Sequence, residues 1–357
     1  MSNAVKPLGR HQHWLALLLI GVVLLLVPFV AALGGQAWVR IANFAILYVF
    51  LALGLNIVVG YAGLLDLGYV AFYAVGAYTY ALLASPHFAI HLPFWVILPF
   101  GAGLACIFGV LLGAPTLKLR GDYLAIVTLG FGEIIRIFMN NLNAPINITN
   151  GAQGITLIDP IRIGDFSLSQ TSTVLGVTLS GPQKYYFLLV ALAILVIVIN
   201  IRLQDSRIGR AWQAIREDEV AAKACGINTR NIKLLAFAMG ASFGGIAGGV
   251  FSAMQGFVSP ESFSLMESIT ILAMVVLGGM GHIPGVILGA VLLTGLPEAL
   301  RYGIEPLQKM VFGRMLIDPE SLRMLVFGLA LVLVMRFRPA GLWPSPQRRR
   351  ELSESTD

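Results

Sequence analysis

The sequence predicts an all-α fold, a polytopic membrane helix bundle of about ten transmembrane helices, some of them broken or re-entrant. Two observations predict this class. Hydrophobic residues make up 57% of the 357 residues, charged residues make up 12%, and the mean hydropathy is +0.82, whereas a soluble domain has about 45–50% apolar and about 25% charged residues. The apolar residues also gather in long windows. We therefore expect residues 1–357 to form one transmembrane domain in a lipid bilayer.

Seven windows meet or approach the roughly 20 apolar residues that a membrane-spanning helix needs, and they contain few charges. In chain order they are 14–33, 41–60, 94–113, 123–142, 185–203, 233–256 and 322–338. The first window follows Lys6 and Arg10, as in a signal peptide. It is longer than the apolar core of about 7–15 residues in a signal peptide, so we expect an uncleaved anchor.

Three further apolar segments, 67–84, 267–280 and 283–300, are shorter or are interrupted by Gly and Pro. Each is either a full span, a half-helix or a re-entrant segment. If all three cross the bilayer, the chain has ten spans and its two termini lie on the same side.

The positions of Lys and Arg predict that this side is the cytoplasm, because cytoplasmic loops carry an excess of positive charge. With both termini inside, 16 of the 24 Lys and Arg residues are cytoplasmic and seven are external. The loop at 204–232 and the polar tail at 339–357 are then cytoplasmic, and the loop at 143–184 is external. Because topology explains the net charge of +6, we expect a multi-pass membrane protein and no nucleic-acid partner.

The stretch 60–68, GYAGLLDLG, interrupts two apolar runs with three glycines and one acid. A broken helix at membrane depth is tolerated only where it is buried in protein or lines a cavity. We therefore predict a translocation path here, and its residues are Gly60, Tyr61, Gly63, Asp66, Gly68, Phe72 and Gly76. Asp66 has an alternative role, as the N-cap of a helix that starts at Leu67.

Glu133 and Arg136 lie near the middle of the window 123–142, three residues apart and hence on one helix face. An unpaired charge at the bilayer centre costs about 2.5–3.5 kcal/mol even on a lenient scale, so we predict that the two side chains pair. The pair is either structural, inside the bundle, or part of a gate or proton relay.

Residues 206–225 are predicted to form an amphipathic helix, with Ser206 as N-cap and Gly226 as its stop. The apolar residues Ile208, Trp212 and Ile215 recur at the spacing of one helix face. Such a helix lies on lipid headgroups, connects two spans in solvent, or inserts into a groove of a soluble partner.

Glycines at every fourth position predict faces on which helices approach closely. The two repeats are Gly240, Gly244 and Gly248, and Gly281, Gly285 and Gly289.

No motif of the chain points to chemistry of its own. It contains no G-x-x-x-x-G-K-[ST] phosphate loop, no nucleophile elbow and no H-E-x-x-H motif. Its five histidines have no established metal-ligand spacing. Cys106 lies in an apolar span and Cys225 in a polar loop, so we expect no disulfide between them. We predict no enzymatic activity, no cofactor and no metal, and any energy source must be another subunit.

The chain resembles the LivM-type permeases, the membrane subunits of branched-chain amino-acid ABC importers. The resemblance rests on residues 54–78, 119–137, 148–155, 206–251, 258–290 and 336–344. It implies that the cytoplasmic helix engages an ATPase through Trp212, Ile215, Arg216, Glu217, Asp218, Glu219, Ala221, Ala222 and Gly226. The broader importer motif E-A-A-x3-G is only partly present, because Val220 occupies the position of its Glu.

The resemblance also implies a location in the cell inner membrane, with the loop 143–184 in the periplasm, and it implies partners. These are a homologous second permease, two ATPase subunits that bind ATP and Mg, and a periplasmic binding protein that docks on the external loop at Thr149, Asn150, Gly151 and Gly154. Ala152 and Gln153 stand where the family often has Pro and Asn, so the detail of this loop departs from the pattern. Either a heterodimer or a homodimer of permeases fits the residues.

The implied substrates are leucine, isoleucine and valine. Urea, short amides and other amino acids are alternatives, because related permeases with similar sequences serve them. A secondary carrier or channel for small polar solutes is the alternative from another class.

Overall fold

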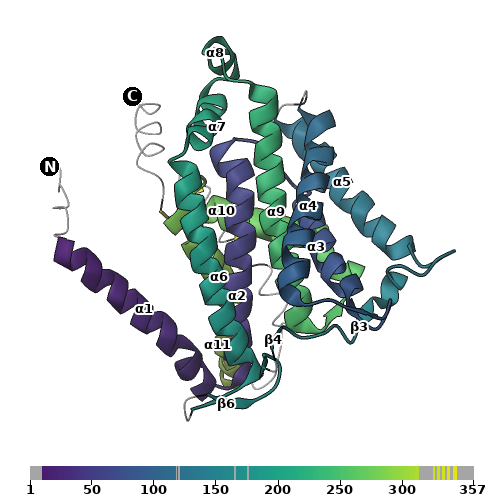
Figure 1. The fold of residues 1–357 in the computed structure, drawn as a ribbon. Coiled ribbons are helices and arrows are strands. Elements are labelled where there is room, and N and C mark those ends of the chain that lie inside the picture. The colour runs from purple at the N-terminus through teal and green to yellow at the C-terminus, as the bar shows by residue number, and fades with distance from the viewer. Residues whose placement is uncertain are drawn as a thin grey trace.

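The computed structural model describes residues 10–117, 119, 121–164, 166–174, 177–312, 325, 328–329, 332–333, 336–337 and 341–343. These residues form a mostly helical bundle (Figure 1). The helices are α1 (Arg10–Leu33), α2 (Gln36–Asn56), α3 (Val70–Leu83), α4 (Phe94–Thr116), α5 (Asp122–Asn141), α6 (Gly181–Gln204), α7 (Arg207–Glu217), α8 (Glu219–Ala224), α9 (Thr229–Gln255), α10 (Leu265–Gly278) and α11 (Ile283–Phe312). The π-helical turn η1 (Ile57–Tyr61) continues α2, and the 3-10 turns η2 (Gly151–Gln153) and η3 (Pro260–Phe263) lie in loops.

Four helical segments among the described residues are long and apolar enough to cross a bilayer: Gln36–Tyr61, Phe94–Thr116, Gly181–Gln204 and Thr229–Gln255. Shorter apolar helices cover Gly21–Leu33, Val70–Leu83, Leu265–Gly278 and Ile283–Ala299. A membrane helix bundle is therefore confirmed. The predicted window 322–338, both termini and most of the tail 339–357 lie outside the described residues, so the ten-span count and the orientation stay predictions.

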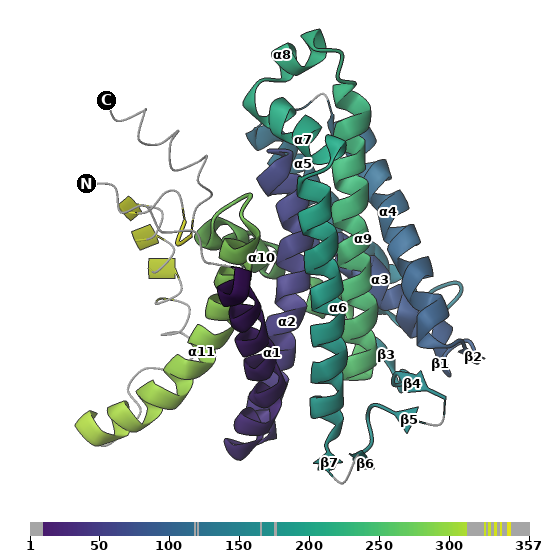
Figure 2. The ribbon, with the colours of Figure 1, turned by 60° about the vertical axis from the view of Figure 1, so that its left-hand side comes forward.

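The strands are two or three residues long and form four antiparallel pairs in loops. The hairpins are β1 (Ala84–Ser85) with β2 (Ile90–His91), β4 (Arg162–Ile163) with β5 (Phe166–Ser167), and β6 (Ser172–Val174) with β7 (Val177–Leu179). β3 (Ile155–Thr156) pairs with the distant β8 (Phe257–Val258). Figures 1 and 2 place β3 to β7 at the end of the bundle opposite α7 and α8.

Helix α3 forms the centre of the bundle, where it packs against α9 and α4. Every residue from 70 to 81 is buried. This packing depends on glycine, because a Cβ at Gly76 would overlap the backbone of Gly245, and a Cβ at Gly248 would overlap the carbonyl oxygen of Tyr73. The first predicted glycine repeat thus marks a true helix contact. The second does too, since Gly285 and Gly289 lie against the backbone of α10.

The outer helices present apolar side chains to the surroundings. Exposed examples are Trp95, Phe100 and Leu111 on α4, and Leu195 and Val198 on α6. In water such a surface would be unfavourable, whereas lipid tails are as apolar as these side chains. The distribution of exposed residues is therefore that of a bundle in a bilayer.

Glycine at position 248 is expected to be essential for the α3–α9 contact. We predict that Gly248→Ala destabilises the protein by about 1–3 kcal/mol, because the added methyl group forces two backbones apart. Gly249→Ala is the matched control. Its added Cβ would make only ordinary van der Waals contacts, with Leu98 Cδ1 at 3.5 Å and Tyr80 Cβ at 3.9 Å. Thermal unfolding of both variants in detergent checks this, and equal melting temperatures would contradict it.

Candidate coupling site and external charged cluster

Helix α7 is amphipathic, as predicted, and its apolar face is buried on the bundle. Ser206 accepts a hydrogen bond from the Gly209 N–H at 3.1 Å and so caps the helix. Trp212 is fully buried, and its indole N–H donates to the carbonyl oxygen of Ile232 in α9 at 2.7 Å. A Cβ at Gly209 would overlap the backbone at the end of α6. α7 is therefore held tightly against α6 and α9.

The predicted single helix at 206–225 is wrong in one respect, because the chain breaks at Asp218. Its backbone is extended, with φ −151° and ψ 112°, and its carboxylate accepts from the N–H groups of Val220 and Ala221 at 2.7 and 3.1 Å. Asp218 thus ends α7 and caps α8, as free carboxylates do at helix starts. The acid that we assigned to ATPase contact also shapes the turn.

Arg216 joins α7 to the end of α2. Its guanidinium Nη1 donates to the carbonyl oxygen of Gly60 in η1 at 2.5 Å. Its aliphatic carbons lie over Gly63, which has φ +69° and where a Cβ would stand 2.8 Å from Arg216 Cγ. The views in Figures 1 and 2 both place α7 beside this end of α2. The predicted coupling helix therefore contacts the predicted break directly.

Side chains from two other helices also satisfy the backbone of the break. Thr128 Oγ1 in α5 accepts from the Leu67 N–H at 3.0 Å, and Ser268 Oγ in α10 accepts from the Val70 N–H at 3.1 Å. Asp66 accepts from the Gly68 N–H at 2.9 Å, so it closes a local turn. The predicted helix start at Leu67 is wrong, because α3 begins at Val70 and Asp66 is not its N-cap.

A second break lies beside the first. The N–H of Gly281, between α10 and α11, donates to Asn56 Oδ1 at 2.8 Å. A Cβ at Gly60 would overlap Asn56 Oδ1 and approach Gly281 N to 2.6 Å. The α10–α11 turn, η1 and Arg216 therefore meet at Gly60.

The predicted path residues fall into two groups. Gly60, Gly63, Asp66 and Gly68 lie at the break, and Tyr61 donates from its hydroxyl to Gln204 Oε1 at 3.4 Å. Phe72 and Gly76 lie in buried α3, where they contact glycines of α9, and Phe72 also packs against Phe131 of α5. The second group belongs to the packed core of the bundle.

Glu219 joins α8 to α9 by ion pairs. Lys233 Nζ is 2.8 Å and Lys223 Nζ is 3.1 Å from its carboxylate. The hydrogen bond from Lys233 and then that from Lys223 hold the pKa of Glu219 at about 2, against the opposing effect of burial. Both ion pairs therefore persist throughout the physiological pH range.

Glu133 and Arg136 form a pair on α5, and a third charge joins them. Arg136 Nη2 is 2.5 Å and Nε is 3.1 Å from the Glu133 carboxylate. Arg136 Nη1 also donates to Glu261 Oε1 in η3 at 3.3 Å. The side chains are 25% (Arg136), 37% (Glu133) and 66% (Glu261) exposed, so this pair is at the surface of the chain and not inside the bundle. We call these three residues the external charged cluster, because the predicted topology places this end of α5 outside.

Glu261 is not among the residues predicted from the sequence. It lies in a polar loop before the segment 267–280, where an acidic residue is common and does not indicate a functional site. Only the packing of η3 against the end of α5 brings it to Arg136.

The loop predicted to receive a binding protein lies beside this cluster. Thr149 Oγ1 donates to the carbonyl oxygen of Met139 in α5 at 2.5 Å, and Asn150 Nδ2 donates to that of Gly154 at 2.9 Å. Asn150, Gly151 and Gly154 all have positive φ, between 56° and 70°. The loop is therefore a tight, defined turn on the end of α5.

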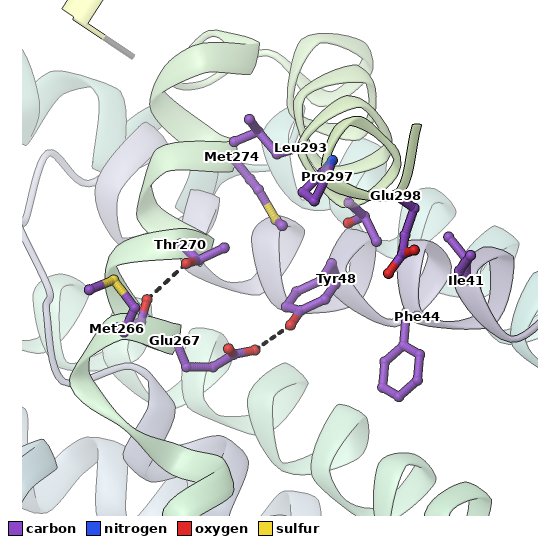
Figure 3. Close-up of a pocket in the computed structure, with 11 residues that line it drawn as sticks. Ile41, Phe44, Tyr48, Met266, Glu267, Thr270, Met274, Leu293, Pro297 and Glu298 are labelled. Carbon is purple, nitrogen blue, oxygen red and sulfur yellow. Dashed lines mark hydrogen bonds between the residues drawn. The ribbon is translucent and has the colours of Figure 1, made fainter. Parts of the chain in front are cut away.

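A cavity of about 360 Å³ lies between α2, α10 and α11 (Figure 3). Tyr48 donates from its hydroxyl to Glu267 Oε1 at 2.6 Å at one side, and Glu298 projects into it from α11. No predicted path residue lines it. Glu267 at the start of an apolar window was the signal that could have identified it.

Among the described residues, no group of three or more His, Cys, Asp or Glu side chains is arranged to hold a metal ion.

Comparison with known proteins gives consistent matches. The family model described as branched-chain amino acid transport system, permease component, matches residues 37–335. The high-affinity branched-chain amino acid transport system permease protein LivM of Escherichia coli is 44% identical over 351 residues, covering 94% of this chain and 76% of that protein. LivM of Salmonella typhimurium is 45% identical, with 95% and 76% covered. The permease protein LivH of Salmonella typhimurium is 25% identical over 305 residues, with 84% and 92% covered. No solved structure matches the chain.

The ion pair between Glu219 and Lys233 is expected to fix α8 to α9. We predict that Glu219→Gln lowers the free energy of unfolding by about 1–3 kcal/mol, because it leaves the buried Lys233 ammonium without its partner. Lys223→Met is the control and should cost less than about 1 kcal/mol, because that side chain is 55% exposed.

Thermal unfolding of both variants measures this difference. Because folding lowers the pKa of Glu219, its ionised form stabilises the protein above its ordinary pKa of about 4.3, and this contribution is lost only as the pH falls through about 2. The deficit of Glu219→Gln should therefore be constant between about pH 6 and pH 8. A deficit no larger than that of Lys223→Met would contradict the prediction.

Proposed function

The chain belongs to the family of permease components of branched-chain amino acid transport systems, and we propose that it forms the translocation path of an ABC importer for leucine, isoleucine and valine. The observation that carries this proposal is the family match over residues 37–335 together with the LivM relatives along almost the whole chain. The four membrane-length segments and the additional apolar helices support it.

In this proposal the end with α7 and α8 faces the cytoplasm and receives an ATPase subunit. Val220 is 68% exposed at the tip of α8, and Glu217, Asp218, Ala221 and Lys223 are also exposed there. An exposed apolar residue ringed by polar ones suits a protein partner. Trp212, Ile215 and Ala222 are buried, so they hold the helices in position while the exposed residues make the contact. ATP and Mg are bound by the ATPase subunits.

Arg216 transmits movement from the ATPase to the path. When ATP binding displaces α7, the hydrogen bond to the Gly60 carbonyl pulls on η1, and through Asn56 on the α10–α11 turn. Broken helices suit this role because the break absorbs the movement while the flanking helices stay rigid. The opposite end, with the loop 143–184, receives the periplasmic binding protein and its cargo. A homologous permease, comparable to the LivH relatives, completes the path.

Transport by the reconstituted complex tests this function. We expect proteoliposomes with this chain, its partner permease and the ATPases to accumulate leucine only when ATP and the binding protein are both present. The chain alone should take up no leucine under an ion gradient, whereas a secondary carrier would take it up. Calorimetry with the cognate binding protein checks the substrate, and heat from urea without heat from leucine would overturn the assignment.

Replacing Arg216 is expected to uncouple ATP hydrolysis from transport. We predict that Arg216→Lys lowers leucine uptake per ATP hydrolysed by about tenfold, because an ammonium cannot reproduce the planar guanidinium contact with Gly60, and one charged hydrogen bond is worth about 1.5–3 kcal/mol. Arg210→Lys is the matched control in the same helix, since Arg210 donates to the Asp205 carbonyl oxygen away from the break. Uptake and phosphate release are measured together, and equal ratios for both variants would refute this coupling role.

A further inference from the structure

We propose that the external charged cluster, Glu133, Arg136 and Glu261, is a recognition site for the charged head group of a zwitterion, an ammonium next to an oxyanion, and that the amino-acid cargo occupies it on entering the path. This inference rests on the proposed function and adds to it a place where the permease itself reads the cargo.

These charges are exposed on an apolar helix. α5 is 20 residues long, or about 30 Å, and Arg136 stands five residues before its end. Ile134, Ile137 and Phe138 beside the cluster are exposed, as is usual next to lipid or another subunit. Charges that face acyl chains are costly, whereas charges that line a water-filled path or meet a partner are the common case in membrane proteins. Exposed charges at this place therefore suit a water-filled path or a partner surface better than acyl chains.

Arg136 has hydrogen-bonding capacity beyond its bonds to Glu133. An Arg guanidinium has five N–H donors. Glu133 accepts from Nε at 3.1 Å and from Nη2 at 2.5 Å, whereas Nη1 has only the long bonds of 3.3 and 3.5 Å to Glu261. One Nη2–H and the weakly bound Nη1 group can therefore donate to an oxyanion, and charge-assisted hydrogen bonds from a guanidinium to a carboxylate are strong.

Glu261 completes the site from the other side. Its bonds to Arg136 Nη1 are long, at 3.3 and 3.5 Å, and its bond from Asn140 Nδ2 is 3.4 Å. A carboxylate held this loosely and 66% exposed can accept an ammonium without losing a strong partner. With Glu133 and Glu261 against Arg136 the cluster has a formal charge of −1, so an ammonium is attracted while Arg136 orients the oxyanion.

The cluster also lies close to the loop that is predicted to receive the binding protein. η2 packs on the end of α5, and η3 packs on α5 and η2. The cluster thus lies next to the loop on which the proposed binding protein docks. A cargo released there meets Glu261 and Arg136 before it reaches the break at 60–68.

Two zwitterions share this chemistry: an amino acid and an ethanolamine lipid headgroup. The experiment separates them through the composition of the bilayer. The complete complex is placed in nanodiscs and vesicles with or without phosphatidylethanolamine, and phosphatidylglycerol, whose headgroup has no ammonium, replaces that lipid where it is left out. Leucine binding without the binding protein, leucine uptake and ATP hydrolysis are measured in both.

We expect Glu261→Gln and Arg136→Gln to weaken leucine binding about tenfold or more and to lower uptake per ATP to a similar degree in both bilayers. Isoamylamine and 4-methylpentanoate, which each lack one of the two charges of leucine, should compete about tenfold more weakly than leucine. Glu261→Asp should restore part of the binding. Asp122→Asn, at the other end of α5, is the control that removes a carboxylate elsewhere and should behave as the unaltered protein does.

Several outcomes would overturn the proposal. If Glu261→Gln and Arg136→Gln bind leucine as tightly as the unaltered protein does, the cluster is not the recognition site. An effect confined to bilayers with phosphatidylethanolamine would assign it to a lipid headgroup. If the variants also lose the stimulation of ATP hydrolysis by the binding protein, the cluster is a docking site. If the unaltered complex binds no leucine without the binding protein, the site is also rejected. Failure of the proposed function would look different, because the unaltered complex would then take up no leucine at all.

Discussion

The backbone of the break at 60–68 sets the arrangement of this protein. At membrane depth no water satisfies free N–H and C=O groups, so a helix can stop only where other groups bind them. Here the partners come from three helices: Thr128 of α5 and Ser268 of α10 accept from the N–H groups of Leu67 and Val70, and Arg216 of α7 donates to Gly60. Satisfying one short segment therefore brings α5, α7 and α10 to the same place.

The centre of the bundle is built around this place. α3 leaves the break and is buried from its first residue to residue 81. It fits between α4 and α9 only because Gly76, Gly245 and Gly248 allow backbones to touch. Close backbone contact is the main source of stability where the solvent is as apolar as the side chains. The core is thus closely packed.

Charge is concentrated at the two ends of the described bundle. At one end Glu219 pairs with Lys223 and Lys233 and fixes α8. At the other end Arg136 lies between Glu133 and Glu261, in a more open arrangement. The first is closed by two ion pairs around a mostly buried carboxylate, whereas the second joins the short Glu133–Arg136 pair to the exposed Glu261 by long bonds. The closed arrangement suits a structural contact, and the exposed oxygens of the second suit a binding surface.

The sequence alone determined the membrane class, the positions of most helices, the close glycine contacts and the cap at Ser206. These features depend on local composition and on spacing along one element, which are visible in the chain itself. It also placed Glu133 and Arg136 on one helix face, because three residues are nearly one turn. The extra break at Asp218 was missed, since an amphipathic pattern continues across it and only the extended backbone reveals it.

Tertiary structure decided which distant residues meet. Arg216 and Gly60 are 156 residues apart, and Arg136 and Glu261 are 125 apart. No periodicity relates such positions, because their proximity depends on how whole helices pack. The sequence identified a coupling helix, a break and an ion pair. The fold brought the coupling helix to the break and added Glu261 to the ion pair. The reason is that backbone groups and charges in a bilayer must find partners within the protein, wherever in the chain those partners lie.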